Sequence, residues 1–278
     1  MNLPSFAPGK ERRSVVESCN TRGYHRQTRQ EARSSLDRRA GSRDKVDFVV
    51  VNGENAAGGI GLTPNVAKEI LGAGVDVITT GNHVWRDREM AGFLPSERRI
   101  VRPANYPQGV PGHGWTIVNR DALRLAILNL QGRVFMQPID CPFMVADAAV
   151  DRIGSDADAI VVDFHAEATS EKQALGLYLD GRVSAVVGTH THVQTSDARI
   201  LPNGTGFITD LGMCGPINSV IGMDPETVIP KFITAMPSRF EVGKGPVVIS
   251  GVMIEVDTST GKTKDIQRFS EETDDTIR

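Results

Sequence analysis

Short apolar runs alternate with segments of helical periodicity along the chain from residue 46 onward. Four apolar runs predict buried strands, at 46–51, 76–80, 159–164 and 184–188. Four further segments predict helices, at 64–72, 86–94, 143–153 and 170–179. A hairpin is expected within 117–130, and later strands at 207–209 and 247–256 flank a predicted helix at 225–235. This alternation is typical of an α/β fold.

The first 45 residues do not continue the pattern. They hold nine Arg and two Lys against five acidic residues, a net charge of +6, whereas the remaining 233 residues carry −9 of the total −3. Their few large apolar residues are scattered. We therefore divide the chain into an atypical basic segment, 1–45, and one domain over 46–278, a size that single α/β domains reach.

Several interpretations of the basic segment stay open. A disordered, solvated tail fits its composition. A transit peptide fits the Arg and Ser content but not the five acidic residues, and a secretory signal would need an apolar core that is absent. An RNA-binding arm is a further alternative, although only Phe6 and Tyr24 could stack on bases and the net charge of the whole chain does not indicate RNA.

Cysteine usage and hydropathy bear on the location of the protein. Cys19, Cys141 and Cys214 lie far apart and form no CxxC pair, so we expect neither a disulfide framework nor a thiolate metal site, and the cytoplasm is the expected compartment. No stretch approaches 18 consecutive apolar residues, so we expect no transmembrane helix and no membrane partner.

Polar side chains follow five predicted strands at the points where the strands end. They are Glu54 and Asn55, Asn82 and His83, His165 and Glu167, His190 and His192, and Asp210. Ligands of open α/β sheets bind beyond the carboxyl ends of the strands, so this set, which includes four of the six histidines, predicts a metal centre. In a straight strand His190 and His192 would point to opposite sides. They therefore either serve two ions or are brought together by a turn.

The ligand chemistry narrows the kind of centre. Imidazole, carboxylate and amide ligands without thiolate suit Fe, Mn, Zn, Co or Ni. A structural zinc site is closed by four ligands, often thiolates, whereas more than four candidates are present here. An open or dinuclear catalytic centre is therefore indicated, and paired ions clamp the attacking and leaving oxygens of a displacement at phosphorus. Neither a GxSxG elbow nor a GxxxxGK[ST] loop occurs as a rival motif.

Four segments together resemble the YmdB-type branch of the calcineurin-like metallophosphoesterases. They read NGENAAGG at 52–59, RPANYP at 102–107, DFHAEATSEK at 163–172 and VGTHTHVQT at 187–195. The resemblance covers residues 46 to about 260. It implies a four-layer α/β/β/α sandwich and two metal ions, iron or manganese. It also implies hydrolysis of small phosphodiesters such as 2′,3′-cyclic nucleotides, and it leaves a homo-oligomer open.

The resemblance also implies a role for individual residues. Glu54 would bridge both metals, Asn82, His165 and His190 would complete the second site, and Asn55 and His192 would serve the first. His83 would be the general acid that protonates the leaving oxygen, with a metal-bound hydroxide as nucleophile. Arg133 is a weaker candidate for contact with the phosphate, and a surface cation is an equal alternative for it.

One element of the family pattern is missing from the sequence. The family opens with an apolar strand running into Gly-Asp, whose Asp ligates the first metal, but residues 20–25 contain no Asp and follow no apolar strand. We therefore expect the first strand to be missing or replaced and the first metal site to be weakened. A displaced reading frame or an unnatural start would explain this segment. The alternative function is a catalytically impaired, nucleotide-sensing or regulatory protein of the same fold.

Overall fold

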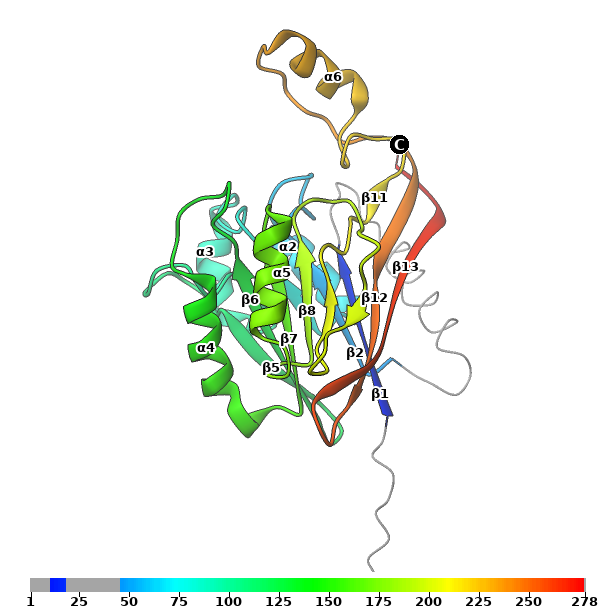
Figure 1. Ribbon diagram of the computed structural model, residues 1–278. Coiled ribbons are helices and arrows are strands. Elements are labelled where there is room, and N and C mark those ends of the chain that lie inside the picture. The colour runs from blue at the N-terminus through cyan, green and yellow to red at the C-terminus, as the bar shows by residue number, and fades with distance from the viewer. Residues whose placement is uncertain (1–10, 19–45, 278) are drawn as a thin grey trace, which may run out of the picture.

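The computed structural model describes residues 11–18 and 46–277, which form two β-sheets with helices packed against them (Figure 1). The first sheet has the order β11 (Gly215–Pro216), β12 (Gly245–Asp257), β1 (Glu11–Ser18), β2 (Phe48–Asn52), β3 (Val77–Thr79) and β4 (Ile100–Val101), and β13 (Lys262–Ile277) also pairs with β12. The second has the order β5 (Trp115–Arg120), β6 (Leu123–Gln131), β7 (Ala159–His165), β8 (Ala185–Thr189), β10 (Gly206–Ile208) and β9 (Arg199–Ile200). The helices are α2 (Pro64–Gly72), α3 (Glu89–Phe93), α4 (Pro142–Ile153), α5 (Thr169–Tyr178) and α6 (Pro225–Thr234), with short 3₁₀ turns η1 (Leu94–Ser96) and η2 (Gly154–Asp156).

Apolar side chains separate these elements into packed layers. One buried cluster joins α2 and α3 to the first sheet, a second joins α4 and α5 to the second sheet, and a third lies between the two sheets. Alternate residues of a strand point to opposite faces, so in β2 Val49 and Val51 enter the first cluster while Phe48 and Val50 enter the third. Both faces of the central strands are therefore buried, which explains their continuous apolar runs.

Local signals set the helix starts. Thr63 accepts a hydrogen bond from the Val66 amide at 3.3 Å and Pro64 occupies the first turn of α2, so the helix begins with an N-cap and a proline that favour this start. Helix α6 begins in the same way, with the Asp224 carboxylate accepting from the Glu226 amide at 2.8 Å. This helix stands away from the two sheets at the top of Figure 1.

Most predicted elements are present, and the hairpin is confirmed as β5 and β6. The helix expected over 86–94 is shorter, because residues 82–88 form turns and bends and α3 begins only at Glu89. Strand β13 was not expected from the pattern. Among the described strands it pairs with β12 alone. A strand in this position does not need the continuous apolar sequence of a fully buried strand. Across the ranges 11–18 and 46–277, no helix has the length and apolar character needed to cross a membrane.

The expectation that the first strand is missing is wrong. Residues 11–18 form β1, which runs parallel to β2 and antiparallel to β12 and so fills the position between them. Main-chain hydrogen bonds to two neighbours hold a strand whatever its side chains are, so an apolar run is not needed for pairing. A replaced first strand remains in agreement with the structure. The rest of the basic segment, including the place of the missing aspartate, lies outside the described residues.

Candidate functional site

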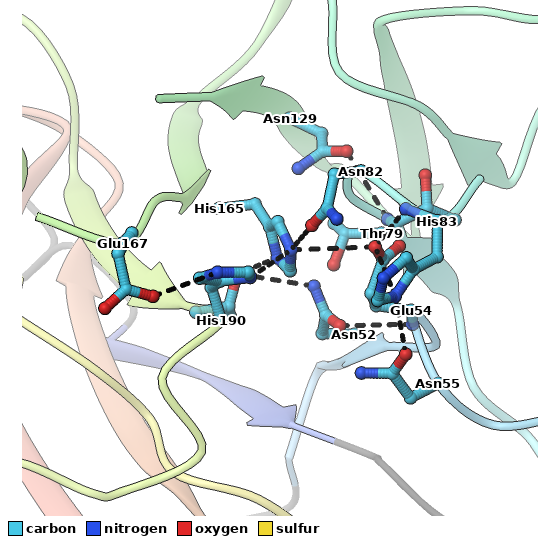
Figure 2. A network of polar contacts seen from close by, with 12 residues as sticks. Asn52, Glu54, Asn55, Thr79, Asn82, His83, Asn129, His165, Glu167 and His190 are labelled. Atoms are coloured by element: carbon cyan, nitrogen blue, oxygen red, sulfur yellow. Dashed lines mark hydrogen bonds and ion pairs between the residues drawn. The ribbon is translucent and has the colours of Figure 1, made fainter. Parts of the chain in front are cut away.

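The polar residues predicted at strand ends meet in one place. Glu54 and Asn55 follow β2, Asn82 and His83 follow β3, His165 ends β7, and His190 and His192 follow β8. Figure 2 shows most of these side chains turned toward one another from segments far apart in the sequence. The structure thus brings together the seven strand-end residues proposed as metal ligands or as the acid, while the role of each stays a prediction.

Glu54 lies at the centre of the cluster. Its side chain is 2% exposed, and its Oε1 accepts the His83 amide hydrogen and lies 3.4 Å from His83 Nδ1 and 3.6 Å from His165 Nε2. Its Oε2 is buried and has no hydrogen-bond partner among the described residues. Burial raises the pKa of Glu54 to about 8, although the amides of His83 and Gly81 oppose the shift. Among the residues that the structure describes, the ion-pair contacts of Glu54 are with the rings of His83 and His165 only.

The hydrogen bonds of His165 determine its tautomer. The Thr189 hydroxyl donates to Asp163 Oδ1 at 2.7 Å, so Thr189 Oγ1 is left to accept from His165 Nδ1 at 3.0 Å. The neutral ring then carries its hydrogen on Nδ1 and presents a lone pair at Nε2. That atom lies 2.9 Å from Asn82 Oδ1, which is also an acceptor, and 3.0 Å from His190 Nδ1. Two acceptors facing each other at this distance are better satisfied by a cation than by each other.

The His-x-His segment leaves the strand at the point where it reaches the cluster. His190 has φ 105° and His192 has φ 67°, both in the left-handed region that residues with a Cβ seldom adopt. The two rings consequently reach different partners. His190 contacts His165 and lies 3.1 Å from Glu167 Oε2, whereas His192 lies 3.4 Å from Asn55 Nδ2. Both rings therefore reach the cluster but at different partners, and whether they serve one ion or two stays a prediction.

A second chain of hydrogen bonds links His83, Asn55 and His192. Asn55 Oδ1 accepts from His83 Nδ1 at 2.9 Å, and Asn55 Nδ2 donates to His192 Nε2 at 3.4 Å. His192 Nδ1 in turn donates to the Ile221 carbonyl at 2.9 Å. These contacts agree with one orientation of the Asn55 side-chain amide. In the neutral form of His83 the ring hydrogen is therefore on Nδ1, and Nε2 is an acceptor.

Burial favours the neutral form of the imidazoles in the cluster. Burial is the largest cause in every case and lowers the pKa of His83, His165, His190 and His192 below the usual value. The neighbouring rings lower the pKa of His165 further. Neutral imidazole is the form that ligates metals.

Sequence reasoning missed the groups that support the cluster. Asp163 on β7 is buried, and its carboxylate accepts from Asn52 Nδ2 at 2.9 Å and from the hydroxyls of Thr79 and Thr189. Burial raises the pKa of Asp163, and these three hydrogen bonds oppose the shift. Its signal in the sequence was a single carboxylate inside an otherwise apolar strand. Through Thr189, it holds the ring of His165 in position.

Arg133 lies in the loop after β6. Its side chain is exposed, and its amide donates to Glu171 Oε1 at 3.0 Å. The preceding Gly132 amide donates to the His165 carbonyl at 3.0 Å, so the backbone at this position is tied to β7 beside the cluster. Contact with a phosphate stays a prediction for Arg133.

The residues present fit bound metal ions by their chemistry. A buried carboxylate oxygen without a partner, two amide oxygens and neutral imidazole nitrogens form the oxygen and nitrogen donor set that borderline and hard divalent ions prefer. Among the residues that the structure describes, no three His, Cys, Asp or Glu side chains stand in a ready-made arrangement for an ion. The donor atoms contact one another instead.

Comparison with known proteins gives concordant results. The family model described as YmdB-like protein matches residues 26–269. The 2′,3′-cyclic-nucleotide 2′-phosphodiesterase of Bacillus subtilis (strain 168) is 51% identical over 225 residues, which cover 81% of this chain and 85% of that protein.

Solved structures agree with this match. A crystal structure described as a novel phosphatase from Mycoplasma pneumoniae is 33% identical, with a TM-score of 0.87 over 96% of this chain and 95% of that chain. The NAD nucleotidase of Haemophilus influenzae is 12% identical, with a TM-score of 0.56 over 94% of this chain and 56% of that chain. At that identity the likeness shows the fold alone, an α/β fold with mixed sheets that a nucleotidase shares.

Proposed function

Because this chain belongs to the YmdB-like protein family, we propose that it is a metal-dependent hydrolase of phosphoric diesters with 2′,3′-cyclic nucleotides as substrates. The observation that carries the proposal is the convergence of Glu54, two amide oxygens and neutral imidazoles on one buried point. The activity named for the Bacillus subtilis relative supports the substrate class. The three apolar clusters support a four-layer α/β/β/α sandwich as the family architecture.

Two ions, iron or manganese, would be held by the strand-end residues. Glu54 would contact both ions. Asn82, His165 and His190 would hold one, and Asn55 and His192 the other. Bound ions supply Lewis acidity that stabilises charge on the phosphoryl oxygens.

His83 is the proposed general acid. Its ring is anchored through Nδ1 by Asn55, while 34% of the side chain is exposed, so Nε2 can face a substrate. Burial, Arg86 and His192 lower its pKa. A lower pKa makes the protonated ring a stronger acid toward the departing ribose oxygen, although a smaller fraction is protonated at neutral pH.

A regulatory protein that binds nucleotides without turnover is the second candidate. It is favoured by one observation, the absence of Asp from residues 20–25, where the family pattern has a ligand of the first metal. Loss of one ligand would weaken an ion at Asn55 and His192 more than one at His165 and His190.

Turnover and metal content together test the proposal. With added Mn²⁺, the protein should hydrolyse 2′,3′-cAMP and bis-p-nitrophenyl phosphate, and His83→Ala should lower kcat by about 100-fold or more. Arg124→Ala is the control, because Arg124 lies at the opposite end of β6 from Gln131, which pairs with His165. Glu54→Gln should reduce the Mn²⁺ retained after gel filtration, measured by elemental analysis. Nucleotide binding without turnover in the unaltered protein would instead support the regulatory function.

A further inference from the structure

A cavity lies beside the edge strands of both sheets. Its volume is about 610 Å³, within the range of small-molecule sites. It lies beside β5, the edge strand of the second sheet, and beside the residues that lead into β4, the edge strand of the first. None of the residues of the histidine cluster lines it.

The lining of this cavity is cationic. Among the described residues, its lining contains Arg98, Arg99 and Arg152 and no carboxylate. Arg99 is engaged by Glu97, with its Nε 2.9 Å from Oε1 and a terminal nitrogen 2.7 Å from Oε2. Arg98 and Arg152 are exposed, and neither has an ion-pair partner in the part of the chain that the structure describes. Residues 46–278 carry a net charge of −9, so two uncompensated guanidinium groups mark a local site for an anion.

The cavity also offers groups that recognise a planar ring. Trp115 on β5 is half-buried, with one side packed against the cluster beneath α4 and α5. His113 also lines the cavity, although its Nε2 is itself buried and has no hydrogen-bond partner among the described residues. Its backbone is fixed, since the His113 carbonyl accepts from the Arg102 amide at 2.9 Å. An exposed aromatic surface in a cavity of this size suits stacking of a nucleobase.

We infer that this cavity is a second nucleotide site, separate from the histidine cluster, in which Arg98 and Arg152 bind the phosphates and Trp115 stacks on the base. Guanidinium groups bind phosphate oxygens through paired hydrogen bonds. The three segments involved converge only through the fold: Arg98 follows η1, Trp115 begins β5, and Arg152 lies in the last turn of α4.

Trp115 allows binding to be measured directly. The chain has two tryptophans, so Trp85→Phe leaves Trp115 as the only fluorophore of that kind. We expect ADP, added to full-length Trp85→Phe protein in EDTA to prevent turnover, to quench this fluorescence with saturation. Inorganic phosphate and adenosine should each bind at least about tenfold more weakly than ADP. Equal binding of phosphate and ADP would overturn the role of the base.

Matched variants locate the site. Arg98→Ala/Arg152→Ala should weaken ADP binding by about tenfold or more in calorimetry of the otherwise unaltered protein. Arg239→Ala/Arg268→Ala removes two exposed arginines outside the cavity and should leave binding unchanged. His83→Ala/His165→Ala, titrated in EDTA, reports any ADP that binds at the histidine cluster. Loss of binding in the histidine variant with retention in Arg98→Ala/Arg152→Ala would show that the histidine cluster is the only nucleotide site and overturn the inference.

Discussion

The ammonium group of Lys172 on α5 lies 2.6 Å from Asp210 Oδ2, and both side chains are buried, at 1% and 0% exposure. The same carboxylate accepts the Thr191 amide at 3.0 Å and, through Oδ1, the Gly212 amide at 2.9 Å. Asp210 therefore holds the residue between His190 and His192. The ion pair connects helix α5 to the segment that carries two histidines of the cluster.

Breaking this pair should be costly. Lys172→Met leaves Asp210 buried without its cation, so we expect the free energy of unfolding in urea to fall by about 3–5 kcal/mol. Lys172→Met/Asp210→Asn should recover much of the loss, because no uncompensated charge remains. Arg124→Ala is the control, since its pair with Asp158 is exposed and should contribute little. A double variant no more stable than Lys172→Met would contradict this account.

Gly81 makes room for the ring of His165. A Cβ built on Gly81 would lie 2.3 Å from His165 Cδ2, so Gly81→Ala must displace the imidazole. We expect this variant to lose about 100-fold in kcat for 2′,3′-cAMP, because small misplacements of catalytic groups are costly. Gly92→Ala is the matched control: Gly92 lies in α3 with nothing within 4 Å of the added carbon, and the change should stabilise the helix by about 0.5–1 kcal/mol. Unchanged kinetics in Gly81→Ala would show that the ring position is not critical.

Substitution of Arg133 tests whether its side chain contacts the phosphate or is only a surface cation. If its exposed side chain reaches the substrate, Arg133→Ala should raise KM for 2′,3′-cAMP by about tenfold with little change in kcat. Steady-state kinetics beside Arg124→Ala measure this. An unaltered KM would assign Arg133 to the surface.

Asp197 should make stability depend on acid pH. Burial alone would raise its pKa, but hydrogen bonds from Thr195 and Thr209 outweigh burial and hold the pKa below 3.8. A lowered pKa stabilises the folded state above the unfolded pKa, and this contribution is lost as the pH falls through the folded pKa. The Asp197→Asn variant should therefore be less stable than the unaltered protein at pH 6, and the difference should shrink below about pH 4. Urea unfolding at several pH values, with exposed Asp156→Asn as control, measures it; a constant difference would contradict the assignment.

The candidate site could be predicted in outline because its polar residues stand directly after apolar strands in the sequence. Glu54 and Asn82 follow apolar strands of the first sheet and His165 ends an apolar strand of the second, and parallel strands deliver their carboxyl ends to one edge of each sheet. The spacing of His190 and His192 could not show where their rings point. The direction of the rings depends on the positive φ of both residues. In the same segment the Thr191 amide donates to Asp210 and His192 Nδ1 donates to the Ile221 carbonyl.

Neither strand β1 nor the cavity lined by Arg98 and Arg152 could be predicted from the sequence. The basic composition of residues 1–45 argued against a strand, yet β1 lies between β2 and β12, since backbone pairing does not require apolar side chains. Arg98, Trp115 and Arg152 carry no motif, and they share a cavity only because two sheet edges and the end of α4 meet.

By itself, the sequence determined the periodicity of strands and helices and the polar residues at the strand ends, since both depend on the spacing of neighbouring residues. Tertiary structure decided the tautomer of His165, the burial of Glu54 Oε2 and the lowered pKa of His165. Those properties arise from contacts between residues up to more than 100 positions apart, such as Asn52 and Asp163, whose hydrogen bond exists only once the two sheets have packed.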